Sequence, residues 1–122
     1  MSAPFVAYDH VQLAMPAGEE DRARAFYRDV LGMTELEKPD NLKKRGGAWF
    51  ASGSLQLHLG VEADFRSARK AHPALRCTDF DALVAQLRTN GVDVAVEAFE
   101  DGVRHGYIAD PFGNRIELIA SA

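Results

Sequence analysis

The sequence predicts one α+β domain built from two copies of a βαβββ unit. Each half of the chain carries a helical apolar stripe, at positions i, i+3, i+4 and i+7, among short stretches in which polar and apolar residues alternate. The 26 positions that separate Gly32 from His58 equal the 26 that separate Gly91 from Glu117. Upstream of each glycine the spacing differs by three residues, which a longer loop near the N-terminus absorbs. The chain therefore reads strand, helix, strand, strand, strand, twice.

The first unit begins with residues 9–13, where His10 and Gln12 alternate with apolar neighbours and share one face of a strand. A helix is expected over residues 19–31, with acidic residues in its first turn and Gly32 at its end, where glycine is common. Its apolar stripe consists of Ala23, Phe26, Tyr27 and Val30. Three more strands are expected over residues 33–37, 48–51 and 55–59, and residues 38–47 form a polar loop.

The second unit is expected to contain strands over residues 72–77, 92–97, 103–109 and 115–120 and a helix over residues 79–90. The helix has a capping-box-like start at residues 78–81, and Phe80, Leu83, Val84 and Leu87 form its apolar stripe. Residues 110–114 (Asp-Pro-Phe-Gly-Asn) form a tight turn, because proline fixes φ and glycine and asparagine tolerate positive φ. In the strand that follows, Glu117 lies between two apolar residues and points to the polar face.

The length of 122 residues fits a single domain, with module one at about residues 5–60, a linker at 61–71 and module two at about 72–122. The apolar content of 47% and the charged content of 26% are typical of a globular protein. The net charge of −4 argues against general binding to nucleic acid or to an anionic membrane. With one cysteine, no apolar run of about 20 residues and no signal-peptide pattern, the sequence predicts a cytoplasmic protein.

Polar side chains gather on the strand faces that the helices would leave uncovered. His10 and His72 occupy equivalent positions in the two units, and so do His58 and Glu117. If each apolar face packs under its own helix, the polar faces of both sheets line a common cleft. Three imidazoles and one carboxylate in such a cleft are ligands that divalent transition metals accept. Alternatively, these are polar residues on strands that face water.

Five segments carry a resemblance to a known family: Asp9-His10-Val11, Phe26-Tyr27 before Leu31-Gly32, Leu57-His58-Leu59, His72-Pro73-Ala74-Leu75 and Asp110-Pro111-Phe112-Gly113-Asn114-Arg115-Ile116-Glu117. With these segments the sequence resembles the glyoxalase/bleomycin resistance/extradiol dioxygenase superfamily, which has the vicinal oxygen chelate fold. The resemblance spans nearly the whole chain. Its last motif is specific when it follows a paired βαβββ pattern, and weak alone.

The resemblance implies that the two modules form curved mixed sheets around a cleft, often with help from a second subunit. It implies a divalent metal ion (Zn, Ni, Co, Mn or Fe) held by His10, His58, His72 and Glu117. Such a metal would take two adjacent oxygens of a small-molecule substrate and stabilise negative charge on them. Glu117 then either serves as a ligand alone or leaves the metal during turnover and acts as the catalytic carboxylate. The resemblance, together with the need to cover open sheet edges, implies a homodimer.

His58 departs from the glyoxalase lyase pattern, which has a glutamate at this strand position. Three histidines and one glutamate leave a divalent ion with a formal charge of about +1 and remove a carboxylate that could act as a base. Without His58, the set of His10, His72 and Glu117 is a two-His, one-carboxylate triad. Such a triad resembles those of iron oxygenases and of the thiol transferases that inactivate fosfomycin. The short chain argues against a typical extradiol dioxygenase.

Other polar and aromatic residues are candidates for substrate contact. His105 and Tyr107 share one face of the strand over residues 103–109 and either donate to a substrate oxygen as catalytic residues or lie on an exposed or packed face. Arg104 and Arg115 either orient an anionic substrate group or remain on the surface. The remaining substrate candidates are Gln12 and Gln56, on the polar faces, and Trp49, in the core or the cavity wall.

Two function classes remain open from the sequence. The first is a metal-dependent enzyme of lyase, isomerase, thiol transferase or oxygenase type. The second is a metal-free protein that sequesters a drug or metabolite, as bleomycin-resistance members do. Binding members typically lack the ligand set, whereas this chain has ligand-competent residues at all four positions. The sequence therefore favours the enzyme.

Overall fold

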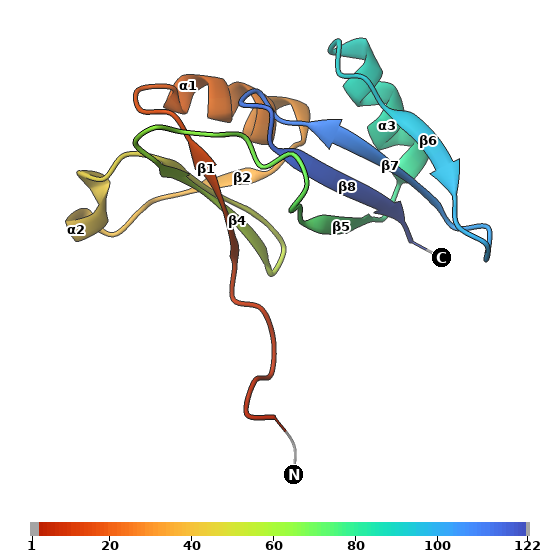
Figure 1. Cartoon of the computed structure of the whole chain (residues 1–122), viewed down its shortest axis with the longest axis horizontal. Coiled ribbons are helices and arrows are strands. Elements are labelled where there is room, and N and C mark those ends of the chain that lie inside the picture. Colours follow the sequence, from red (N-terminus) through yellow and green to blue (C-terminus); the bar gives the residue numbers. More distant parts are fainter. Residues whose placement is uncertain (1–2, 122) are drawn as a thin grey trace.

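In a computed structural model, which describes residues 3–121, the chain forms two four-stranded mixed sheets with one helical segment packed on each (Figure 1). The first sheet has the order β1-β4-β3-β2 and consists of β1 (Val11–Met15), β2 (Thr34–Leu36), β3 (Ala48–Ser52) and β4 (Leu55–Val61). The second has the order β5-β8-β7-β6 and consists of β5 (Ala74–Cys77), β6 (Ala95–Ala98), β7 (Arg104–Ala109) and β8 (Arg115–Ala120). The α+β fold predicted from the repeat is confirmed.

The two sheets also share one pairing pattern. The first and fourth strands of each module are parallel neighbours, and every other pair is antiparallel. Gln12 of β1 lies opposite His58, and Ala74 of β5 lies opposite Glu117. His58 and Glu117 therefore occupy the same place in their sheets, as the spacing in the sequence predicts.

The helices begin close to where the sequence predicts them. The first is α1 (Glu20–Ala23), which continues as a π-helical segment, η1 (Arg24–Val30), with a wide-turn bond from the Leu31 N–H to the Phe26 carbonyl (2.9 Å). The second is α3 (Phe80–Thr89), whose N-cap Asp79 accepts a hydrogen bond from the Ala82 N–H at 3.2 Å. This bond satisfies one of the free donors of the first turn, but the capping residue is Asp79 and not Thr78, with which the capping-box-like pattern begins.

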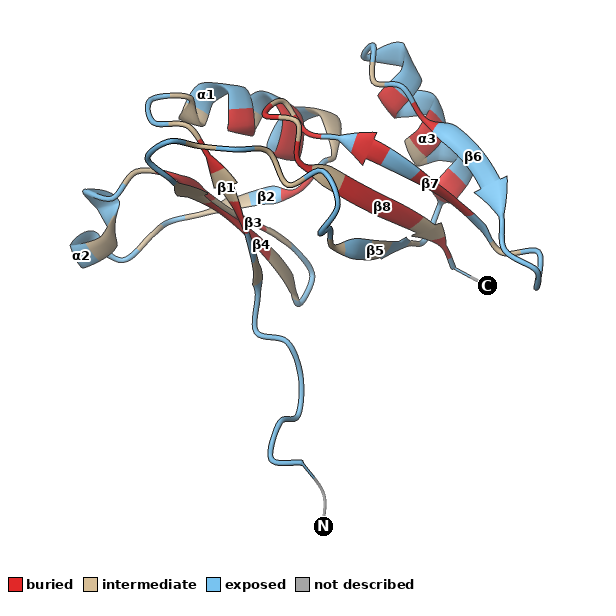
Figure 2. Cartoon of the chain, in the orientation of Figure 1, coloured by how far each residue is buried: buried red, intermediate tan, exposed pale blue. Residues whose placement is uncertain are grey.

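The apolar faces of the sheets and helices meet in a continuous core (Figure 2). In β4 and β8, the last strand of each module, apolar residues alternate with polar ones, and the apolar side chains point toward the helices. The fully buried side chains include Met15, Tyr27, Phe50, Leu57, Leu59, Leu87, Ile116 and Leu118. The polar faces lie on the other side of each sheet, away from α1 and α3.

Several boundaries differ from the sequence-based expectation, among them the start of β6, which is Ala95 and not residue 92. The polar loop over residues 38–47 contains a short helix, α2 (Asp40–Lys43). Strand β1 begins at Val11, so His10 lies in an exposed extended arm that precedes the strand. Strand β5 begins at Ala74 because Pro73 has no N–H for the ladder, although its carbonyl accepts from the Glu117 N–H at 2.9 Å.

The turn between β7 and β8 holds the two modules together. The Asp110 carboxylate accepts hydrogen bonds from the Tyr27 hydroxyl (2.7 Å), from the Phe112 and Asn114 N–H groups (both 2.9 Å) and from the Asn114 amide (3.0 Å). The Asn114 amide also donates to the Ala14 carbonyl at 2.8 Å. Tyr27 and Ala14 belong to module one, so the Asp-Pro-Phe-Gly-Asn turn joins the modules as well as reversing the chain. Within the described residues, no helix is long and apolar enough to cross a membrane.

Candidate functional site

The candidate residues lie on the uncovered faces of the two sheets. His58 lies opposite Gln12 on one side and opposite Trp49 on the other, so the three side chains share the uncovered face of the first sheet. Glu117 lies opposite Tyr107 in β7, on the uncovered face of the second sheet. His10 lies two residues before Gln12, the partner of His58, and His72 lies two residues before Ala74, the partner of Glu117. The register therefore groups His10 with His58, and His72 with Glu117.

In module one, three aromatic rings form a stack. The His58 ring lies between the rings of His10 and Trp49, with centroids 4.1 Å away on each side and interplanar angles of 13° and 7°. Burial is the main cause that lowers the pKa of the His58 imidazole; nearby His10 and Lys38 lower it further, and the Asp9 carboxylate opposes them in part. His58 is only 3% exposed, so its imidazole is neutral near pH 7.

In module two, a carboxylate lies between two imidazoles. Glu117 is 8% exposed, and its two oxygens lie 3.2 Å from His72 Nε2 and 3.0 Å from His105 Nδ1. The His105 ring stacks on Phe99 with a centroid distance of 3.8 Å. His105 is itself only 8% exposed, so its ring contacts the Glu117 carboxylate and has little contact with solvent.

The hydrogen bonds of each imidazole determine which nitrogen is free to bind a metal. A backbone carbonyl only accepts, so the bond between His72 Nδ1 and the Lys70 carbonyl (2.8 Å) places the hydrogen on Nδ1. In neutral His72 the lone pair on Nε2 then faces the Glu117 oxygen, and two acceptors meet at 3.2 Å. A cation between them, either a proton or a metal ion, removes this conflict. Metal-binding histidines commonly have their second nitrogen bonded in this way.

His10, like His72, has its Nδ1 bonded to an oxygen acceptor, whereas His58 does not. His10 Nδ1 lies 2.8 Å from the Asp9 carboxylate, which accepts the hydrogen and leaves Nε2 with a lone pair. His58 Nε2 lies 3.0 Å from the side-chain oxygen of Gln56, and an amide can present either its oxygen or its nitrogen. The donor set that best suits a divalent metal is therefore His10, His72 and Glu117.

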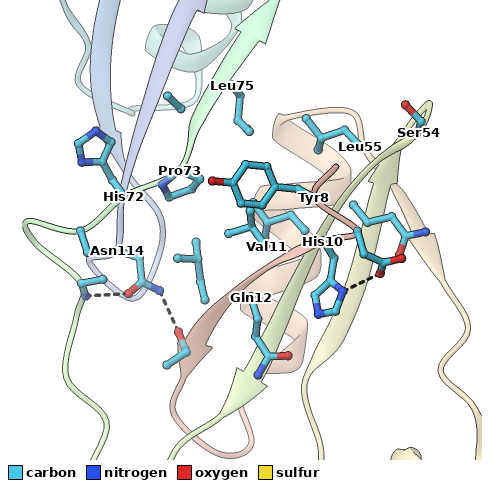
Figure 3. Close-up of a pocket in the computed structure, with 18 of the residues that line it drawn as sticks. Tyr8, His10, Val11, Gln12, Ser54, Leu55, His72, Pro73, Leu75 and Asn114 are labelled. Carbon is cyan, nitrogen blue, oxygen red and sulfur yellow. Dashed lines mark hydrogen bonds and ion pairs between the residues drawn. The ribbon is translucent and has the colours of Figure 1, made fainter. Parts of the chain in front are cut away.

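These donors do not gather at one point. Across residues 3–121, no group of three or more His, Cys, Asp or Glu side chains is arranged to hold a metal ion. His10 and His72 do line the same cavity of about 600 Å³, between β1 and β5 (Figure 3). Tyr8, Val11, Pro73 and Leu75 form part of its wall, and Figure 3 shows the two imidazoles on opposite sides of them.

The structure separates the other predicted residues into two groups. Gln12, Gln56, Trp49, Tyr107 and Arg115 lie on the uncovered faces, with the Arg115 guanidinium 5.0 Å from the centre of the Tyr107 ring. Arg104 points to the opposite face, because it is one residue out of step with His105. There it forms an ion pair with Asp81 of α3 and lies over the Phe80 ring.

Sequence reasoning missed the residues that support the candidate ligands. Asp9 and the Lys70 carbonyl hold the two exposed histidines, and Phe99 covers His105. The adjacency of Asp9 and His10 is visible in the sequence. The contacts of Lys70 and Phe99 depend on loop conformations that no spacing reveals.

Comparisons with known proteins address the family directly. Residues 7–118 match the sequence pattern of the Glyoxalase/Bleomycin resistance protein/Dioxygenase superfamily. The chain belongs to this superfamily. A glyoxalase family protein from Bacillus anthracis is 43% identical, with a TM-score of 0.94 and all of each chain covered.

More distant members of the superfamily share the fold. A lactoylglutathione lyase from Agrobacterium tumefaciens is 24% identical, with a TM-score of 0.72 and 98% of this chain and 96% of that chain covered. The fosfomycin resistance protein FosX from Listeria monocytogenes is 16% identical, with a TM-score of 0.76 and coverages of 97% and 95%. No curated protein matches the chain. At these identities the two structures support the fold of this glyoxalase-superfamily protein and not a particular reaction.

Proposed function

We propose that this protein is a metal-dependent enzyme of the lyase, isomerase or transferase type. Its substrate is a small molecule that binds the metal through two adjacent oxygens. The observation that carries the proposal is the contact between His72 Nε2 and Glu117, at 3.2 Å, with His72 Nδ1 already committed to a carbonyl. Two acceptors at this distance, on the uncovered face of a sheet, favour a bound cation.

The chain's own residues would divide the work as follows. His10, His72 and Glu117 would hold a divalent ion (Zn, Ni, Co, Mn or Fe), with His58 as a fourth ligand or as part of the aromatic stack. The ion supplies Lewis-acid stabilisation of charge on the substrate oxygens. Glu117 would act as the base by leaving the ion during turnover, while His105 holds its other oxygen at 3.0 Å. Substrate contacts come from Tyr107, Gln12, Gln56, Trp49 and Arg115, which share the uncovered faces.

A second copy of the chain would complete the site. We place His72 and Glu117 of one subunit against His10 of a second copy, because these donors remain apart within the described part of one chain. The uncovered faces and an N-terminal arm with exposed Phe5, Val6 and Tyr8 support a homodimer. These three side chains are 87%, 98% and 93% exposed, which is unusual for apolar groups unless a partner covers them.

Two observations keep other functions in consideration. The His10, His72 and Glu117 set has the composition of a two-His, one-carboxylate iron site, which favours dioxygenase-like chemistry if iron is the ion bound. The stack of His10, His58 and Trp49 offers a flat surface beside a cavity of about 600 Å³, which favours a metal-free drug- or metabolite-binding protein.

Elemental analysis of untagged protein, purified without chelator, tests the proposal. We expect about one divalent ion per chain and its loss in His72→Ala, because the variant removes the lone pair that faces Glu117. Arg76→Ala is the matched control, since Arg76 lies in β5, the strand that His72 precedes, on the face of Glu117, but has no role as a ligand. Absence of metal after reconstitution would favour the metal-free binding protein, whereas metal retained in His72→Ala would exclude His72 as a ligand and overturn the site as proposed.

A further inference from the structure

A second cavity lies beside the aromatic stack of module one, under the loop that connects β2 to β3. Its volume is about 250 Å³, and Gln12, Trp49 and Gly60 on the sheet face Lys38, Arg45 and Gly46 on the loop. Gln12 and Trp49 are the two residues that lie opposite His58. The cavity therefore adjoins the candidate metal centre while belonging to a different part of the chain.

The cavity is positively charged. Two cationic side chains line it, and no aspartate or glutamate does. Lys38 donates one of its three hydrogens to the Gly46 carbonyl, which leaves two for another acceptor. Of the loop's ion pairs within residues 3–121, those of Lys43 with Glu37 and Asp40 lie outside the cavity, and none involves Lys38 or Arg45.

The Glu20 carboxylate is bound to the loop backbone and not to either of these cations. Glu20 approaches the loop from α1, but its oxygen accepts from the Gly47 N–H at 2.8 Å and its side chain is not part of the cavity wall. The protein as a whole carries a net charge of −4, so a cavity with two cations and no anion is a local exception. An uncompensated pair of cations in a concave site attracts an anion.

The loop is held in place before any ligand binds. Gly47 has a φ of +85°, and a Cβ there would lie 2.1 Å from the Leu59 carbonyl oxygen, so only glycine allows this close approach to β4. Gly60 likewise leaves room for the Gln12 amide, which would lie 2.5 Å from a Cβ. Lys38 and Arg45 are thus carried by a loop that is seated on the sheet.

We propose that this cavity binds the anionic group of a small organic acid, a carboxylate or a phosphate-type group, between Lys38 and Arg45. The Trp49 indole forms an apolar wall for the adjoining part of the ligand. If the metal centre is as proposed, an anion held here places the rest of the molecule toward His58 and His10. That placement rests on the proposed function, whereas anion binding itself does not.

Trp49 provides a direct measurement, because it is the only tryptophan in the sequence. Its fluorescence is followed in metal-free protein during titration with inorganic phosphate and, separately, with acetate, at constant ionic strength. We expect saturation with a Kd in the millimolar range or below, and the tighter of the two probes identifies the class of anion. Phosphorus-31 line broadening detects phosphate binding that leaves the fluorescence unchanged.

Three charge-removing variants decide whether the cavity is responsible. Lys38→Gln and Arg45→Gln should each weaken binding by about 10-fold or more, as expected for a charge-assisted hydrogen bond. Lys43→Gln removes the same charge from the same loop but from outside the cavity, and should change the Kd by less than about 2-fold. The absence of saturable binding by either method, or equal effects in all three variants, would overturn the proposal. Because the titrations are made without metal, failure of the metal centre leaves their result unaffected.

Discussion

The uncovered faces of the two modules have the same strand order and the same register but different chemistry. In module one, His58 is a buried neutral imidazole between two aromatic rings. In module two, the equivalent residue is Glu117, a carboxylate with an imidazole at each oxygen. The repeated backbone therefore carries two different side chains at equivalent positions. Only Glu117, through its contact with His72, has a contact that a cation would stabilise.

The comparison shows that a ligand-competent residue at a repeat-equivalent position is not thereby a ligand. What separates the two modules is the partner of each second ring nitrogen. Carbonyl or carboxylate acceptors hold Nδ1 of His10 and His72 and leave Nε2 free, whereas His58 has an amide partner and two stacked rings. We therefore expect module two to supply the anchor of the metal centre and module one to supply one further ligand and an aromatic wall.

Replacing each of the two equivalent residues, Glu117 and His58, by glutamine tests this difference most strongly. Glu117→Gln removes the anionic ligand and should lower metal affinity by more than about 100-fold, beyond the range of changes in supporting residues. His58→Gln should lower it by less than about 10-fold if His58 belongs to the stack. Affinities are measured by competition with a chelating dye.

Glu97→Gln is the matched control, because Glu97 lies opposite His105 in β6 and is exposed. It should leave the affinity unchanged. Equal losses in Glu117→Gln and His58→Gln would show that the modules contribute alike and that four residues bind the metal.

The same assay can distinguish the role of His105, as a residue that supports Glu117, from the role of His72 as a ligand. His105→Leu removes the hydrogen bond to Glu117 and should lower metal affinity by about 10- to 100-fold. His105→Asn places an amide N–H near the position of Nδ1 and should restore most of the loss. The cobalt-substituted protein should show an altered visible spectrum in His105→Leu and a native one in His105→Asn. If Asn fails to rescue while both variants remain folded, His105 is itself a ligand or contacts the substrate.

A mixing experiment shows whether the two modules meet within one chain or across two. His10→Ala and His72→Ala are each expected to lack metal. If the site is shared, one site of each mixed dimer has both histidines, and unfolding and refolding the two variants together should restore about a quarter of the wild-type metal content. No restoration, with dimers present by light scattering, would place the whole site within one chain.

Much of the fold was predictable from the sequence because local patterns and the repeat agree. Gly32 and Gly91 end the two helices where positive φ is needed, and the alternation in β4 and β8 places Leu57 and Leu118 in the core. The short helix in the polar loop was not predicted, because a single turn has no apolar periodicity. The strand expected over residues 72–77 begins instead at Ala74, because Pro73 has no N–H for the ladder.

The candidate site was less predictable than the fold. Alternation places His58 and Glu117 on the uncovered faces, which the register shows directly. Arg104 is predicted either to orient an anionic substrate group or to remain on the surface, and alternation in β7 places it on the helix side, where it pairs with Asp81. The orientation of His72 depends on the carbonyl of a linker residue, and linker conformation leaves no periodic signal.

The smallest expected effect concerns the contact that joins the modules rather than their uncovered faces. Tyr27→Phe removes one of the four donors to Asp110 and should lower the free energy of unfolding by about 1–2 kcal/mol, measured by urea denaturation. Burial raises the pKa of Tyr27 well above its usual value, and the Asp110 charge adds to this. The stabilisation is therefore fully present below about pH 10 and is lost as the pH rises further, because only the unfolded chain then releases the proton. The difference in free energy of unfolding between wild type and Tyr27→Phe should become smaller above that pH.

Tyr107→Phe, at an exposed position, is the control and should leave both the stability and its pH dependence unchanged. If Tyr27→Phe also leaves stability unchanged, the remaining three donors suffice for Asp110, and the modules are joined mainly through Asn114.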